Sequence, residues 1–252
     1  MKTAAGMQRA RFQSGLTRMA YHKRNQNPYS GASHSGHDGG ALGMKNELDY
    51  IRIGAALGGN QEWFTDWSMY DGGCAAVTAC DVCMYLTLRK GIEGLYPYRT
   101  DRFTRQDYIR FSQIMKPYLH PCWQGIDTLE QYISGFSKYC RDIGGYILNM
   151  EGFSGRFSVE GAKGVIQQQI DKGLPIPYLL LYHKNPSFKD FEWHWFNLAG
   201  YGEYGGRFYV RAVTYGLEYW LNLEELWDTG RSRKGGMVLL SVVSVKNKLE
   251  RI

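Results

Sequence analysis

The sequence lacks the long apolar runs that membrane insertion or export would require. No stretch of its 252 residues approaches the roughly eighteen consecutive apolar residues of a transmembrane helix. Basic residues occur near the N-terminus, but no apolar core of the kind found in secretory signals follows them. We therefore expect no transmembrane segment, no secretory signal and a cytoplasmic location.

Cysteine is also scarce. The five cysteines are an odd number, and thiols in a reducing compartment are usually free rather than paired in a disulfide framework. They are Cys74, Cys80, Cys83, Cys122 and Cys140. No second pair of Cys or His residues follows the first three at zinc spacing, so the sequence predicts no metal site, and it indicates no cofactor.

The net charge of +6 is unevenly distributed. Residues 1–44 contain six Lys and Arg side chains against Asp38 alone, so this segment carries +5 of that charge. Within it, residues 25–40 are rich in Gly, Ser and Asn and cannot bury much apolar surface. We predict a basic, flexible tail over residues 1–44, which is either merely solvated or in contact with nucleic acid or an anionic membrane surface.

The first part of the remaining chain has mainly helical patterns. Apolar residues at helical spacing predict a short helix over residues 47–56 and longer helices that begin near Cys74, Thr104 and Gly125. A helical half over about residues 45–145 is therefore expected.

The character of the chain changes near residue 146. Short apolar segments with Gly-rich turns predict antiparallel strands from there to the end, interrupted by an amphipathic helix over residues 158–172. Helices followed by a sheet predict an α+β fold for residues 45–252. In it, the helical half packs on a C-terminal antiparallel sheet or half-barrel over about residues 146–252.

The most informative stretch covers residues 70–86. An Asp-Gly-Gly turn leads directly into a helical pattern in which apolar residues recur at spacings of three and four. Cys74 stands at the junction, where backbone N–H groups and the positive end of the helix dipole lower the pKa of a thiol. A thiolate there is a candidate nucleophile, although a cysteine taken alone is more often a small buried residue. Cys80 and Cys83 lie inside the helix and are interpreted as packing residues.

A candidate base lies 120 residues downstream, in His194-Trp-Phe-Asn-Leu-Ala-Gly-Tyr201, which has strand character. If the sheet packs on the helix, proton transfer from the Cys74 thiol to the imidazole gives an ion pair that attacks an acyl carbon. The Cys74 N–H would then serve as one oxyanion donor. His183 also follows a predicted strand and is the alternative base.

Together these motifs resemble the papain-like cysteine peptidases, and most closely their C39-like branch. The Gly-Cys-Ala-Ala-Val-Thr-Ala helix start at Cys74 is similar to the family's Gly-Cys-Gly-Pro-Thr-Ala, and the His194 segment is similar to its His-Trp-Val-Val-Val-Gly-Tyr. The resemblance covers about residues 60–245, including the order of the elements. It implies a papain-like fold in which Cys74 is the nucleophile, His194 is the general base and a third residue orients the histidine.

Two positions depart from the family pattern. Ser68 stands where the family usually has an oxyanion Gln, about six residues before the nucleophile, while Asn60 and Gln61 are available further upstream. Where an Asp or Asn would orient the base, residues 210–216 offer Thr214 as the only small polar candidate. A backbone carbonyl is the alternative orienting group.

The sequence therefore predicts a cysteine-dependent hydrolase or acyl transferase that acts on a peptide or amide bond. Cys74 and His194 form its catalytic dyad, Thr214 is the candidate orienting residue, and its partner is a peptide or protein substrate. The alternative is a catalytically degenerate papain-like module that binds a peptide or protein partner.

Overall fold

The structure, a computed structural model, describes residues 42–121, 125–145 and 147–243. Most of the predicted basic tail and Cys122 therefore lie outside the described residues, as do any contacts of the tail with nucleic acid or a membrane. The predicted tail boundary at residue 44 falls within the first described strand, β1 (Leu42–Glu47). No helix in the described part of the chain is long and apolar enough to cross a membrane.

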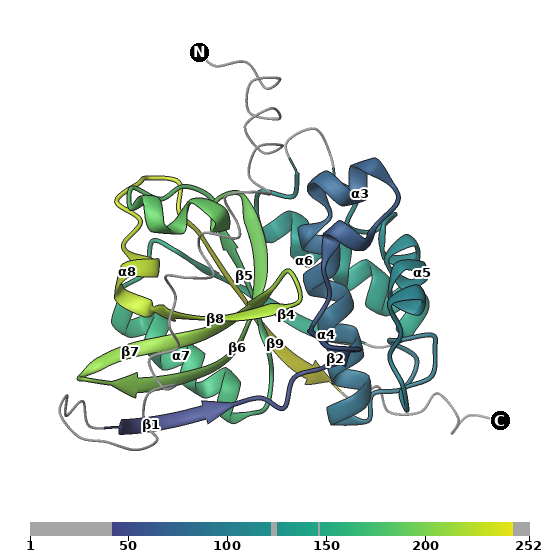
Figure 1. The fold of residues 1–252 in the computed structure, drawn as a ribbon, viewed down its shortest axis with the longest axis horizontal. Helices are drawn as coiled ribbons and strands as arrows, with labels where there is room; N and C mark the ends of the chain where they lie inside the picture. The colour runs from purple at the N-terminus through teal and green to yellow at the C-terminus, as the bar shows by residue number, and fades with distance from the viewer. Residues whose placement is uncertain (1–41, 122–124, 146, 244–252) are drawn as a thin grey trace, which may run out of the picture.

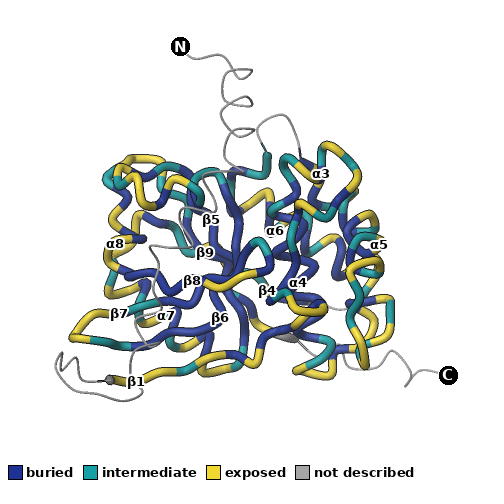
Figure 2. Tube along the Cα trace, in the orientation of Figure 1, coloured by how far each residue is buried: buried dark blue, intermediate teal, exposed yellow. Residues whose placement is uncertain are grey.

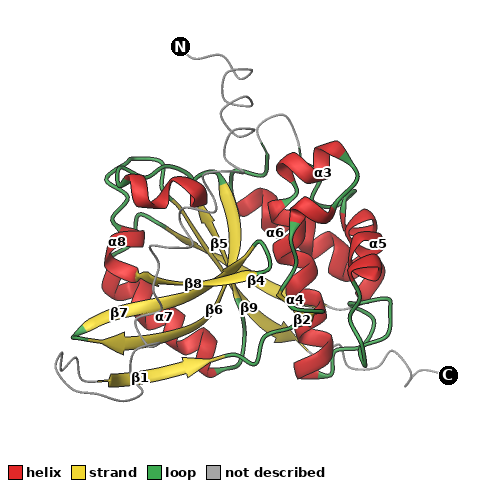
Figure 3. Ribbon diagram, in the orientation of Figure 1, coloured by secondary structure: helices red, strands yellow, loops and turns green. Residues whose placement is uncertain are grey.

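Figure 3 shows that the first half of the described chain is mainly helical, as its apolar spacing predicts. The helices are α3 (Trp67–Gly72), α4 (Cys74–Lys90), α5 (Arg105–Met115) and α6 (Leu129–Tyr139), followed by a π-helical turn, η2 (Cys140–Gly144). Thr104 and Thr128 cap α5 and α6, because each hydroxyl accepts a hydrogen bond from the backbone N–H three residues later.

The short helix predicted over residues 47–56 is wrong. After β1, this segment forms a small hairpin from β2 (Arg52–Ile53) and β3 (Ala56–Leu57). Leu48 and Tyr50 are buried while Asp49 between them is exposed, which is the alternation of an extended chain rather than the spacing of a helical face.

The second half of the chain supplies six strands of a seven-stranded sheet whose described strands pair antiparallel. Besides β1, its strands are β4 (Ile147–Ser154), β5 (Ile176–Leu180), β6 (His194–Tyr204), β7 (Arg207–Thr214), β8 (Leu217–Asn222) and β9 (Gly235–Val243). Their order is β4-β9-β5-β6-β7-β8, and β1 pairs with the distal part of β6. The prediction of an α+β fold with an antiparallel sheet is confirmed for the described residues.

Shorter elements connect these parts. The 3₁₀ turns η1 (Gln61–Trp63) and η3 (Pro186–Phe191) precede α3 and β6. The predicted amphipathic helix is α7 (Val159–Asp171), which lies between β4 and β5, and α8 (Leu223–Trp227) follows β8. Ser158 caps α7 through a hydrogen bond from the Gly161 N–H.

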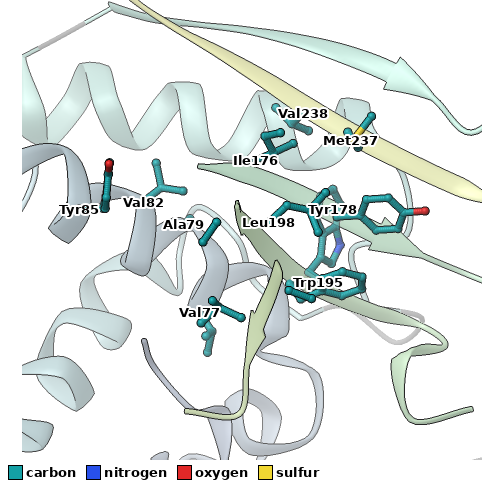
Figure 4. Close-up of a cluster of buried hydrophobic side chains, with 14 of the residues drawn as sticks. Val77, Ala79, Val82, Tyr85, Ile176, Tyr178, Trp195, Leu198, Met237 and Val238 are labelled. Carbon is teal, nitrogen blue, oxygen red and sulfur yellow. The ribbon is translucent and has the colours of Figure 1, made fainter. Parts of the chain in front are cut away.

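The central helix α4 joins the two halves. Figure 1 shows α3, α4, α5 and α6 on one side of the molecule and most of the sheet on the other, and α4 packs against both α5 and β6. Every residue of α4 from 75 to 86 is buried, so this part of the helix is enclosed on all sides. The sequence pattern, in contrast, predicts that only one apolar face is buried. Figure 2 shows this central region as buried, and Figure 4 shows Ala79 of α4 beside Leu198 of β6.

Candidate active site

Cys74 is the first residue of α4 and is half-buried. The chain enters this helix from α3 almost without interruption. The Gly73 N–H donates to the Met69 carbonyl at 2.9 Å, and the Gly73 carbonyl accepts from the Val77 N–H at 2.9 Å. A side chain at position 73 would not fit, because its Cβ would lie 2.2 Å from the Met69 carbonyl oxygen. Gly73 therefore lets α3 run into α4 and puts Cys74 at the start of the buried helix.

The first turn of α4 contains no side chain of its own that offsets its positive end. Within this fully described turn, no side-chain cap is formed and no acidic residue is present. The N–H groups at a helix start and the aligned peptide dipoles favour a negative charge at the first position. The environment of Cys74 therefore suits a thiolate.

The other described cysteines occupy a different environment. Cys80, Cys83 and Cys140 are buried, and burial raises the pKa of all three thiols, that of Cys140 to about 12. Thiols in apolar surroundings stay protonated at neutral pH and react slowly. Their burial agrees with the interpretation of Cys80 and Cys83 as packing residues. Among the described cysteines, Cys74 alone is partly exposed.

His194 and Thr214 meet at one end of two neighbouring strands in the interior of the sheet. His194 is the first residue of β6, and Thr214 is the last residue of its antiparallel neighbour β7. Both side chains are buried, and Nε2 of His194 forms a hydrogen bond with Oγ1 of Thr214 at 2.7 Å. The hydroxyl therefore engages one ring nitrogen, and Nδ1 faces away from it.

A second side chain covers the imidazole of His194. The Tyr215 ring lies parallel to it, with an interplanar angle of 3° and ring centroids 4.6 Å apart. The Tyr215 hydroxyl oxygen lies 3.3 Å from Nδ1 of His194. Because the rings are parallel, this oxygen sits over the face of the imidazole, whereas the Nδ1 lone pair lies in the ring plane. We therefore interpret the contact as stacking rather than as a directed hydrogen bond.

The non-glycine residues with positive φ in the described chain flank this pair. Trp193, directly before His194, has a φ of 56°, and Tyr215, directly after Thr214, has a φ of 53°. Tyr215 and Gly216 form the two-residue loop between β7 and β8, and both have positive φ, as a type I′ turn requires. Asn-Gly is the favoured sequence there, and a left-handed Tyr costs roughly 1–2 kcal/mol. Backbone strain of this kind concentrates at functional sites.

The strained turn is held by the segment that leads toward α3. The Gly216 N–H donates to the Gly59 carbonyl at 3.0 Å, and the Gly216 carbonyl accepts from the Leu57 N–H at 2.8 Å. The Asn60 side-chain amide donates to the Tyr215 carbonyl at 3.3 Å. These bonds join the β7–β8 turn to the chain that leads into α3 and α4.

The side chains considered for the oxyanion site have other partners. Nε2 of the buried Gln61 donates to the carbonyls of Tyr70 and Asp71 at 3.0 and 3.3 Å, while its Oε1 has no hydrogen-bond partner within the described residues. The Ser68 hydroxyl donates to Asp66 at 2.6 Å and belongs to the N-terminal cap of α3. Gln61 therefore supports the backbone just before the candidate nucleophile, and Ser68 has a capping role.

A buried carboxylate fixes the same segment from the side of α4. Both carboxylate oxygens of Asp81 contact the Gly59 N–H, at 3.0 and 3.1 Å, and one accepts from the Tyr108 hydroxyl at 2.8 Å. Burial raises the pKa of Asp81 to about 7, although these hydrogen bonds oppose the shift. Asp81 thus links the interior of α4 to Gly59 and, through Gly59, to the β7–β8 turn.

A direct bond also joins α4 to β6. The Asn197 side-chain amide donates to the Thr78 carbonyl at 3.1 Å. Thr78 lies one helical turn beyond Cys74, and Asn197 lies three residues beyond His194. The helix and the strand are therefore tied together near the candidate nucleophile and the candidate base.

His183, the alternative base, has both ring nitrogens engaged by the backbone. Its Nδ1 accepts from the Asn185 N–H at 2.9 Å, and its Nε2 lies 2.8 Å from the Glu225 carbonyl oxygen. The bond to Nδ1 fixes the tautomer in which Nε2–H donates to that carbonyl. His183 thus has a structural role, and His194 is the better candidate base.

The sequence patterns do not single out Tyr215 or Asp81. A signal for Tyr215 is nevertheless present, because Tyr-Gly separates two strand patterns by two residues, where a type I′ turn calls for Asn-Gly. The corresponding signal for Asp81 is a single carboxylate within an otherwise apolar helical run, since a fully buried Asp is rare unless it is paired.

Among the described residues, no group of three or more His, Cys, Asp or Glu side chains is arranged to hold a metal ion. A comparison with protein-family models finds no model that matches the chain, and a comparison with curated proteins finds no match. A function is therefore inferred from the geometry of the site itself.

Proposed function

We propose that the protein is a cysteine-dependent hydrolase or acyl transferase of the papain-like, C39-like type that acts on a peptide or amide bond. Cys74 is the nucleophile, His194 is the general base, and Thr214 orients the base. The observation that carries the proposal is the 2.7 Å hydrogen bond between Nε2 of His194 and Oγ1 of Thr214. When Nε2 donates to this hydroxyl, Nδ1 is the unprotonated nitrogen that a general base requires.

The chemistry proceeds in two halves. In the first, the Cys74 thiol passes its proton to Nδ1 of His194, and the sulfur attacks the carbonyl carbon. The tetrahedral intermediate collapses to a thioester, and the amine leaves with the proton from Nδ1. In the second, water gives a proton to Nδ1 and attacks the thioester, which releases the acid and returns the proton to sulfur. In an acyl transferase, a second nucleophile takes the place of water.

The start of α4 supports both negative species in this scheme. Its positive end favours the Cys74 thiolate, and the Cys74 N–H is the candidate donor to the oxyanion of the tetrahedral intermediate. The Gln61 amide would be a second donor only after it released the carbonyls of Tyr70 and Asp71.

A catalytically degenerate papain-like module that binds a peptide or protein partner is the second candidate. Two observations favour it: the Gln61 amide already donates to backbone carbonyls, and the group that engages His194 is a hydroxyl rather than a carboxylate. A hydroxyl carries no charge with which to stabilise an imidazolium. In such a module, Cys74 forms no acyl-enzyme.

Reaction with p-nitrophenyl acetate separates the two candidates without knowledge of the natural substrate. A hydrolase is expected to release about one equivalent of p-nitrophenolate in a burst, with the acetyl group found on Cys74 by mass spectrometry. Cys74→Ala abolishes the burst and His194→Ala slows it. His120→Ala, which removes an exposed histidine, is the matched control and leaves the burst unchanged. No burst in the wild type, or one that persists in Cys74→Ala, contradicts the hydrolase and favours the binding module.

A further inference from the structure

We propose that Tyr215 is a positioning residue whose ring, rather than its hydroxyl, fixes the plane of the His194 imidazole. This inference rests on the proposed function, because a base that accepts a proton from Cys74 needs its ring held in one orientation. Thr214 engages His194 at a single atom, Nε2. A hydrogen bond at one atom tolerates rotation about the Cβ–Cγ bond better than a contact across a whole ring face does.

The stacking geometry supplies the restraint that the hydrogen bond lacks. The rings of Tyr215 and His194 are parallel within 3°, with centroids 4.6 Å apart, and the contact extends to the hydroxyl oxygen over Nδ1. Rotation of the imidazole about Cβ–Cγ would drive one of its edges into the Tyr215 ring. The stack therefore opposes the motion that would move Nδ1 away from the position of a base.

The backbone of Tyr215 gives an independent reason to assign it this role. Its φ of 53° belongs to a type I′ turn, for which Asn, Asp or Gly is the favoured residue. A residue selected for the turn alone would be one of these three. The strained conformation is nevertheless maintained, because Asn60 and Gly59 hold the turn through hydrogen bonds. The stack on His194 explains why a tyrosine occupies a position that suits it poorly.

Two substitutions separate the ring from the turn. Tyr215→Phe keeps the ring and removes the hydroxyl, whereas Tyr215→Asn suits the turn and removes the ring. The readout is the tautomer of the neutral His194 side chain, measured by ¹⁵N NMR above the pH at which the ring is protonated. Every protein in this experiment carries Cys74→Ala, so that the result does not depend on thiol chemistry. His194→Ala identifies the signal.

The Cys74→Ala parent and its Tyr215→Phe variant are expected to show one tautomer of His194, with the proton on Nε2. Tyr215→Asn is expected to show a mixture, because a ring that is free to rotate out of this plane loses the Nε2–H bond to Thr214 that fixes the proton on Nε2. The denaturation midpoint of Tyr215→Asn should lie below that of the Cys74→Ala parent only by the small amount that loss of the stack accounts for. With Cys74 restored, Tyr215→Asn should slow the p-nitrophenyl acetate burst on the order of tenfold or more, and Tyr215→Phe should not.

Three results would overturn the proposal. The first is a single tautomer in both Tyr215→Asn and Tyr215→Gly, a second variant that suits the turn, because this would show that the ring does not hold the imidazole. A mixture in Tyr215→Phe would assign the role to the hydroxyl. Unfolding of both turn-compatible variants would make Tyr215 a structural residue. The tautomer measurement tests only the positioning role of Tyr215. The absence of a burst in the wild type would instead contradict the proposed hydrolase.

Discussion

The hydroxyl of Thr214 lies 2.7 Å from Nε2 of His194, and both side chains are buried where β6 begins and β7 ends. The hydroxyl is thus the partner of a buried imidazole N–H. Thr214→Val preserves the shape of the side chain but leaves that donor unsatisfied, which costs about 1–3 kcal/mol. We expect the free energy of unfolding to fall by this amount in urea denaturation, and the p-nitrophenyl acetate burst to slow by roughly tenfold.

Thr214→Ser is the matched control, because it retains the hydroxyl and removes only a methyl group. Its burst rate should remain close to that of the wild type. Equal burst rates for Thr214→Val and the wild type would show that this hydrogen bond does not orient the base.

Asp81 should make stability depend on pH in an unusual direction. Its pKa is raised by burial from 3.8 to about 7, so between these values the folded state binds more protons than the unfolded state. The free energy of unfolding therefore falls as pH rises from about 4 to about 7. Asp81 contributes at most about 4 kcal/mol of stability at low pH, and this contribution is lost as the pH rises through the pKa of the folded state. Asp81→Asn does not titrate and should lack this slope in urea denaturation between pH 5 and pH 8.

Tyr108→Phe provides a control for this effect. It removes one hydrogen-bond donor to the Asp81 carboxylate, so the slope should remain and move to higher pH. Parallel pH profiles for the wild type and Asp81→Asn would contradict the assignment of the slope to this carboxylate.

Gly73 should be intolerant of a side chain. In Gly73→Ala, the Cβ would lie 2.2 Å from the Met69 carbonyl oxygen, so the junction of α3 and α4 must shift. We expect a loss of about 1–3 kcal/mol in the free energy of unfolding and slower acylation of Cys74. Gly164→Ala, within α7, meets no atom within 4 Å and should gain about 0.5–1 kcal/mol. Similar stabilities for the two variants would show that the junction adjusts freely.

The described cysteines should differ sharply in accessibility. Iodoacetamide applied to the folded protein is expected to modify Cys74, whereas Cys80, Cys83 and Cys140 should react only after unfolding, because burial raises the pKa of these three thiols and shields them. Peptide mapping by mass spectrometry measures each site. Modification of Cys83 or Cys140 in the folded protein at the rate of Cys74 would contradict the described core.

Local sequence signals predict much of the fold. The capping threonines Thr104 and Thr128 precede helices with clear apolar spacing, and glycine-containing turns at residues 205–206 and 215–216 join β6, β7 and β8. The error over residues 47–56 has a physical cause. The apolar residues of this short segment also fit an extended chain, and β1 pairs with β6 about 155 residues later, a contact that no local pattern encodes.

In the candidate site, too, some features are visible in the local sequence and others depend on contacts between distant residues. A cysteine at a helix start and a histidine at a strand start are visible as local patterns, and so is the small polar residue at the end of the next strand. The stack of Tyr215 on His194 depends on the handedness of a two-residue turn, and the contacts of Gln61 depend on how α3 folds back toward η1. Such relationships arise from tertiary geometry and are absent from the spacing of residues.

If His194 activates Cys74, the reactivity of the thiol depends on the imidazole, and the pH dependence of Cys74 alkylation reports this dependence. The rate of iodoacetamide modification at Cys74 is measured from pH 5 to pH 10 in the wild type and in His194→Ala. The wild type should retain a reactive plateau well below the pKa of about 8.5 of an ordinary thiol, and His194→Ala should lose that plateau and follow the ordinary profile. Superimposable profiles for the two proteins would show that His194 does not activate Cys74.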